Sequence, residues 1–111
     1  MKESPIFSRT YDLLLWIIPV TVKFPRQHRF VLAQAVQKTA LQFQENLIEA
    51  SKTRNPALSL QKADIELAKL RTHLRLCRDL KLIDMGQYEH VSRMLAEIGR
   101  LLGGWMKNTR K

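Results

Sequence analysis

The sequence predicts an all-α protein, an antiparallel up-down four-helix bundle in which residues 1–111 form a single domain. Four segments carry apolar residues at alternating spacings of three and four, which marks one face of a helix, and no stretch shows the alternation of a half-buried strand. Short polar connections join the segments, and helices joined in this way pack as antiparallel neighbours. A chain of 111 residues has room for one hydrophobic core.

The first predicted helix begins at Ser4 and Pro5, an N-cap residue followed by a proline suited to the first turn. Pro19 has no amide donor, so it should kink or end this helix. The predicted core face comprises Phe7, Tyr11, Leu14 and Ile18.

The same helix is apolar away from that face, at Leu13, Leu15, Trp16 and Ile17. A helix that is apolar all round is buried all round. We therefore predict that Leu13, Trp16 and Ile17 form the interface of a homo-oligomer. The alternative is that this second face lies under the flank of a neighbouring helix.

The second predicted helix begins at Phe24 and Pro25, and a polar stretch that ends at Pro56 follows it. Its core face comprises Leu32, Val36, Ala40, Phe43, Leu47 and Ala50. Ser59 is the predicted cap of the third helix. The core face of that helix comprises Ala63, Leu67, Leu70, Leu74 and Cys77.

Asp84, with Gln87 three residues later, predicts a capping box at the start of the fourth helix. The core face of this helix comprises Tyr88, Val91, Leu95, Ile98, Leu102 and Trp105. Gly103 and Gly104 lie in its last turns, where each glycine costs roughly 1 kcal/mol against alanine.

The charge balance is strongly basic, with 19 Lys and Arg against 10 Asp and Glu and a net charge of +9. Such an excess favours association with polyanions. The basic residues recur at helical spacings on the second, third and fourth predicted helices, and arginine can grip a phosphate with two parallel hydrogen bonds. The predicted nucleic-acid and partner-binding residues are Arg26, Arg29, Arg71, Arg75, Arg78, Lys81, Arg93, Arg100 and Lys107.

Two other interpretations of the basic residues are disfavoured. A solvated bundle surface would also carry Lys and Arg, but the acidic partners are too few to neutralise the excess. A membrane surface is disfavoured because the basic faces are expected to lack adjoining exposed aromatic residues. Nothing resembles a helix-turn-helix reader or a basic zipper, so contacts are expected mainly to the nucleic-acid backbone.

The residues that carry chemistry are scattered, which argues against an enzyme. His28, His73 and His90 fall on different predicted helices, and no pair has the spacing of a helical metal site. Cys77 is the only cysteine, so neither an intrachain disulfide nor a thiolate cluster can form. We expect no catalytic residue, no metal and no cofactor. The longest apolar run, Leu13 to Ile18, is far short of the roughly 20 residues that span a bilayer, and the protein is expected in the cytoplasm.

Several runs of sequence resemble a known family. They are the run Glu97 to Lys107 with its Gly103-Gly104-Trp105, the run Leu70 to Leu80 with the following Gln87-Tyr88, Phe24-Pro25-Arg26, and Asn46-Leu47-Ile48-Glu49. Together they resemble the accessory variability determinant proteins of diversity-generating retroelements. The wider superfamily includes four-helix proteins encoded by intervening sequences in large-subunit ribosomal RNA genes. The segment Thr39 to Glu45 and the alanine at position 50 depart from the ribosomal branch and favour the retroelement branch.

The resemblance implies a homopentameric barrel of four-helix bundles with a positively charged outer surface. It implies a non-catalytic protein that associates with the retroelement's reverse transcriptase and its RNA, with DNA as a second candidate ligand, and that supports mutagenic, template-primed cDNA synthesis. Arg26, Arg29, Arg71, Arg75 and Arg78 carry over as binding candidates. Two alternatives stay open: an intervening-sequence type bundle that binds nucleic acid without a polymerase partner, and a purely structural self-assembling scaffold.

Overall fold

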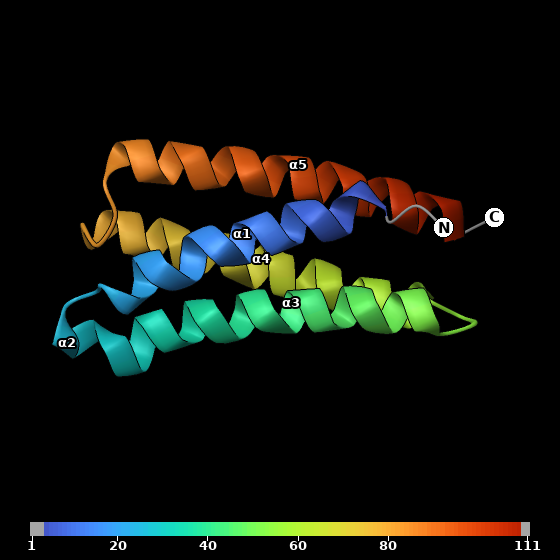
Figure 1. Ribbon diagram of the computed structural model, residues 1–111, viewed down its shortest axis with the longest axis horizontal. Helices are drawn as coiled ribbons and strands as arrows, with labels where there is room; N and C mark the ends of the chain where they lie inside the picture. Colours follow the sequence, from blue (N-terminus) through green and yellow to red (C-terminus); the bar gives the residue numbers. More distant parts are fainter. Residues whose placement is uncertain (1–3, 110–111) are drawn as a thin grey trace.

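Four antiparallel rods make up the computed structural model, which describes residues 4–109 (Figure 1). They are α1 (Pro5–Val22), a second rod that runs from α2 (Arg26–His28) through the π-helical turn η1 (Arg29–Ala33) into α3 (Gln34–Lys52), then α4 (Ala57–Asp79) and α5 (Met85–Thr109). The bundle measures 45 × 24 × 22 Å. α1 packs on α3 and α5, and α4 packs on the same two helices. The predicted four-helix bundle is confirmed over the described residues.

α1 begins where the sequence predicts, at Pro5, with Ser4 in an extended conformation before it. Pro19 does not end the helix, which continues to Val22. The Thr21 hydroxyl donates to the carbonyl oxygens of Ile17 at 2.8 Å and Ile18 at 3.1 Å, so a side chain supports the turn that contains the proline.

The face that α1 buries differs from the prediction. Its buried residues are Ile6, Thr10, Leu13, Leu14, Ile17 and Thr21. Leu13 and Ile17 are 0% exposed within the protomer, so they cannot form the predicted oligomer interface. Trp16 is half-buried, and its ring lies 5.4 Å from that of His90 on α5. The alternative is therefore correct for Leu13 and Ile17, which neighbouring helices cover, whereas Trp16 is covered only in part.

The exposed apolar residues of α1 include one residue of the predicted core face, Tyr11, whereas Leu14 of that face is buried. Tyr11 is 58% exposed, and Leu15 and Val22 are exposed to a similar degree. Two threonines, Thr10 and Thr21, occupy core positions, which hid the true face from a pattern based on apolar residues. Of the residues predicted for the second apolar face, Leu15 is exposed, and Tyr11 and Val22 are exposed with it.

The second rod buries all six residues predicted for its core face. Its first turns contain a feature that the sequence did not indicate, the π-helical turn at Arg29–Ala33. An i→i+5 turn accommodates one extra residue, so it shifts the rotational phase of the residues before it relative to α3.

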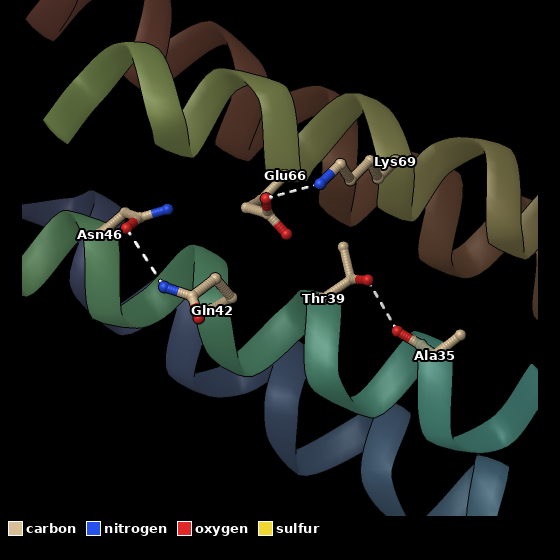
Figure 2. Close-up of polar contacts among 6 residues, drawn as sticks. All are labelled: Ala35, Thr39, Gln42, Asn46, Glu66 and Lys69. Carbon is tan, nitrogen blue, oxygen red and sulfur yellow. Dashed lines mark hydrogen bonds and ion pairs between the residues drawn. The ribbon is translucent and has the colours of Figure 1, made fainter. Parts of the chain in front are cut away.

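The α3–α4 contact has a polar margin (Figure 2). Thr39 donates to the Ala35 carbonyl at 2.7 Å, and Gln42 donates to Asn46 at 3.4 Å. Across the contact, Lys69 and Glu66 on α4 form an ion pair at 3.1 Å. Thr39 and Asn46 are both buried, so this margin belongs to the packing of the two helices.

Ser59 corrects another prediction. α4 begins at Ala57, three residues earlier than a cap at Ser59 would allow. Ser59 is buried and donates to a Glu49 carboxylate oxygen at 2.9 Å, so it joins α4 to α3 instead of capping a helix. The predicted core face of α4 is buried throughout.

α5 starts with the predicted capping box. The Gln87 amide donates to Asp84 Oδ1 at 2.7 Å, and the Asp84 amide donates to Gln87 Oε1 at 2.9 Å. At the other end of the helix, the rings of Trp105 and Phe7 meet edge to face with centroids 5.9 Å apart. Tyr88 and Trp105 are half-buried, whereas the other four predicted core residues are buried.

Candidate nucleic-acid interface

The three arginines of α4 lie on its flank beside α5. Each follows a buried residue of the core face by one position, which turns it about 100° away from the core. Arg71 Nη2 donates to the Leu95 carbonyl at 3.2 Å, and the Arg78 guanidinium lies 4.6 Å from the centre of the Tyr88 ring. These two contacts place the three arginines along the line where α4 and α5 meet.

Gly99 makes room for Arg71. A Cβ atom at position 99 would collide with Arg71 Nη2. The guanidinium therefore crosses α5 at a position that has no side chain, and its hydrogen bond to the Leu95 carbonyl holds it there. Arg71 has a role in joining the two helices in addition to any role in binding.

Two further candidates are engaged within the chain. Arg78 pairs with Asp79 at 2.8 Å while it covers the Tyr88 ring. Arg100 makes two parallel hydrogen bonds to the Glu97 carboxylate, each 2.9 Å long. These pairs reduce the net charge that Arg78 and Arg100 offer to a ligand.

Arg75, Arg93 and Lys107 are exposed on the α4–α5 side of the bundle. Arg93, Arg100 and Lys107 recur every seven residues, so they share the outer face of α5. Within residues 4–109 the ion pairs are those of Lys69, Arg78 and Arg100, so Arg75, Arg93 and Lys107 keep their charge available. We refer to these predicted residues of α4 and α5 as the α4–α5 basic face: Arg71, Arg75, Arg78, Arg93, Arg100 and Lys107.

Arg26, Arg29 and Lys81 lie at one end of the bundle, where α2 and the α4–α5 turn are found (Figure 1). Arg29 Nε donates to the Phe24 carbonyl at 3.1 Å, which fixes the chain reversal between α1 and α2. Lys81 sits in that turn with a φ of 62°, a left-handed conformation that is uncommon for lysine. The structure thus divides the nine predicted residues between one long face and one end.

Two exposed apolar residues at this end were not among the predicted site residues. Phe30 is 79% exposed and Val31 is 73% exposed, directly after Arg29. The expectation that the basic surfaces lack adjoining aromatic residues is therefore wrong at Phe30. The only signal in the sequence is their position between two buried stretches, and the π turn that exposes them has no sequence signature.

Among residues 4–109, the titratable groups show no arrangement typical of catalysis. Burial raises the pKa of the Cys77 thiol to about 11, so it stays protonated at neutral pH. Among the described residues, no group of three or more His, Cys, Asp or Glu side chains could hold a metal ion. The hollow at the α4–α5 turn, lined in part by Lys81, Asp84 and Met85, is open to solvent.

Comparison with known proteins decides the family. A family model described as bAvd-like matches residues 5–109. The chain belongs to the bAvd-like family. This match confirms the predicted resemblance to the accessory variability determinant proteins. No curated protein matches the chain.

The bAvd-like chain also has a structural neighbour. A protein of unknown function from the S23 ribosomal protein family of Bacteroides thetaiotaomicron VPI-5482 superposes with a TM-score of 0.80. The alignment covers 92% of this chain and 98% of the other at 21% identity, so it shows a shared fold. The family match extends over every helix described above, including both the π turn and the α4–α5 basic face. Across residues 4–109, each helix of this bAvd-like protein is too short or too polar to cross a membrane.

Proposed function

We propose that this bAvd-like protein is a non-enzymatic accessory subunit of a diversity-generating retroelement. It binds RNA, with DNA as a second ligand, and the reverse transcriptase, and it supports mutagenic, template-primed cDNA synthesis. The family supports the accessory, non-catalytic role. The observation that carries nucleic-acid binding is the α4–α5 basic face, where Arg75, Arg93 and Lys107 keep exposed charges along two adjacent helices.

The chemistry of this face fits a phosphate backbone. Its charges follow the long axis of the bundle, and a polyanion lying along that axis meets several of them at once. Among the described residues, no helix or β-ribbon projects from the bundle to enter a nucleic-acid groove and contact base edges. Binding is therefore expected to depend little on the base sequence. The net charge of +9 would also speed association with RNA.

Titration of RNA against salt tests this proposal. Each single-stranded phosphate that a cation engages contributes roughly −0.7 to the slope of log K against log salt. The variant Arg75→Glu/Arg93→Glu should lower RNA affinity at least about ten-fold and make the slope shallower. The variant Lys52→Glu/Lys62→Glu changes the net charge equally on exposed positions elsewhere and is the matched control.

Equal losses in the two variants would show a non-specific charge effect and would contradict an interface at the α4–α5 basic face. A slope near zero for the unmodified protein would contradict the electrostatic mechanism altogether. Association with the polymerase needs its own test, co-purification with the reverse transcriptase encoded nearby and its RNA.

The runner-up function is an intervening-sequence type bundle that binds nucleic acid without a polymerase. The fold shared with the S23-family protein favours it as an alternative. Genomic neighbours distinguish the two: a reverse transcriptase gene with template and variable repeats supports the first, and a ribosomal RNA gene supports the second. A purely structural scaffold is the third alternative, and it predicts that Arg75→Glu/Arg93→Glu leaves RNA binding unchanged.

A further inference from the structure

Phe30 and Val31 are the most exposed of the large hydrophobic side chains. The next is Leu58, at 61%. Burying a phenylalanine side chain is worth about 1.5–3 kcal/mol, so folding gains little from Phe30 as it stands. The ring of Phe30 is therefore free to contact a ligand outside the protomer.

The backbone that carries Phe30 is firmly anchored. The next two residues, Leu32 and Ala33, are 6% and 3% exposed and pack into the core. Before it, Phe24 is buried, and its carbonyl accepts the Arg29 Nε hydrogen bond at 3.1 Å. A π turn inside a longer helix is frequently found at a functional site. Here the turn directs Phe30 outward from a rigid support, so the ring is not part of a frayed end.

The surroundings of Phe30 are positively charged. Lys23, Arg26 and Arg29 are all exposed and precede it within seven residues. Between Leu13 and Gln44 the chain contains no aspartate or glutamate. Local acidic residues of the rod therefore cannot neutralise these charges. The α4–α5 turn lies at the same end of the bundle (Figure 1), and because it carries both Lys81 and Asp84 it adds no net charge there.

An exposed aromatic ring among unpaired cations matches single-stranded nucleic acid. Such ligands bind by stacking bases on aromatic side chains while cations hold the phosphates. A duplex keeps its bases stacked inside and offers no base face to Phe30. A second copy docked through the same end would bring its own Lys23, Arg26 and Arg29 against these cations. An interfacial membrane helix needs an apolar face over several turns, whereas the exposed pair here occupies one turn.

We propose that Phe30 is a stacking platform for a base of single-stranded nucleic acid, with Arg26 and Lys23 contacting the adjoining phosphates and Val31 extending the apolar surface. This inference rests on the proposed nucleic-acid binding and deepens it, because it adds a base contact at the end of the bundle to the backbone contacts of the α4–α5 basic face. It predicts a preference for unpaired over paired strands.

Binding of the full chain to a fluorescein-labelled 15-nucleotide oligouridylate and to an RNA duplex of equal length tests the platform. Phe30→Ala should weaken binding to the single strand at least about five-fold and leave duplex binding nearly unchanged. Phe30→Trp should retain single-strand affinity, and its added indole fluorescence should be quenched on binding. Leu58→Ala removes another exposed apolar side chain, on α4, and should change neither affinity.

Phe30→Ala protein that binds single strand and duplex as the unmodified protein does would overturn the platform while leaving the proposed function intact. The platform would also be overturned if Phe30→Ala weakened only binding to phosphatidylserine vesicles, which would assign the ring to a membrane. The same holds if the variant weakened only self-association in sedimentation. Unmodified protein that binds neither RNA would overturn the proposed nucleic-acid binding as well. Because Phe30 is largely exposed, its replacement should leave helicity and thermal unfolding unchanged, which circular dichroism verifies.

Discussion

Arg71 and Arg75 are the same residue type one helical turn apart, yet their surroundings differ. Arg71 crosses α5 above Gly99 and donates to the Leu95 carbonyl, whereas Arg75 is exposed without such a contact among the described residues. The spacing of the arginines predicted that they lie on one face of α4, because spacing decides which residues share a helix face. It could not distinguish the two roles, since these depend on which residue of another helix lies opposite.

Replacing Gly99 tests the role of Arg71. Gly99→Ala gains helix propensity worth about 1 kcal/mol, but its Cβ displaces the guanidinium and removes a hydrogen bond from a charged group, worth about 1.5–3 kcal/mol. We therefore expect a net loss of stability, measured as the free energy of unfolding in urea. Gly104→Ala is the control, since a Cβ there meets no atom within 4 Å, and it should stabilise the protein by up to about 1 kcal/mol.

A double-mutant cycle separates the gain in helix propensity from the loss of the Arg71 hydrogen bond. In an Arg71→Met background, Gly99→Ala has no guanidinium to displace and should become neutral or stabilising. If Gly99→Ala destabilises both backgrounds equally, Arg71 is not the cause, and the account of this contact is wrong.

At the scale of elements, the sequence predicted the helices well and their exact faces less well. The second, third and fourth predicted helices bury the predicted residues almost throughout, because each has a continuous apolar stripe on an otherwise polar surface. The first helix has apolar residues on every side, so the pattern alone could not select among rotations, and threonines occupy two of the buried positions. The π turn depends on how the α1–α2 reversal packs, which is a tertiary property.

The start of α5 offers a prediction about a single element. Asp84→Ala removes the side-chain acceptor of the capping box and should lower the free energy of unfolding by about 0.5–2 kcal/mol, because the backbone N–H of Gln87 loses its hydrogen-bond acceptor. Asp84→Ser keeps a capping oxygen and should lose much less. Thermal unfolding followed by circular dichroism measures both. Equal losses would mean that the Asp84 carboxylate stabilises the turn in some other way.

At the scale of the whole molecule, self-association remains a proposal with a corrected surface. Tyr11, Leu15 and Val22 recur on one exposed face of α1 at spacings of four and seven. On the neighbouring α3, Leu41 and Ile48 are exposed as well. We propose that these side chains, instead of Leu13, Trp16 and Ile17, form the interface of a homo-oligomer. The expected assembly is the homopentamer that the family resemblance implies.

Sedimentation velocity at low micromolar concentration measures the assembly. The unmodified protein should sediment as an oligomer, and Leu15→Glu should shift it toward the 13.0 kDa monomer, because the change places a charge in an apolar interface. Leu58→Glu introduces the same charge at an equally exposed position of α4 and should leave the assembly intact. A monomeric unmodified protein, or dissociation by both variants alike, would contradict an interface on α1.

The two ends of the bundle are unlike in their connectivity. α1 begins and α5 ends at one end, beside the α3–α4 turn, whereas the π turn with Phe30 lies at the other (Figure 1). A tether attached near either of those helix ends would therefore hold the protein by the end remote from Phe30. On a sensor surface or a bead, the end with Phe30 would lie up to 45 Å, the length of the bundle, from the support. The proposed stacking platform would then stay accessible to single-stranded nucleic acid in solution.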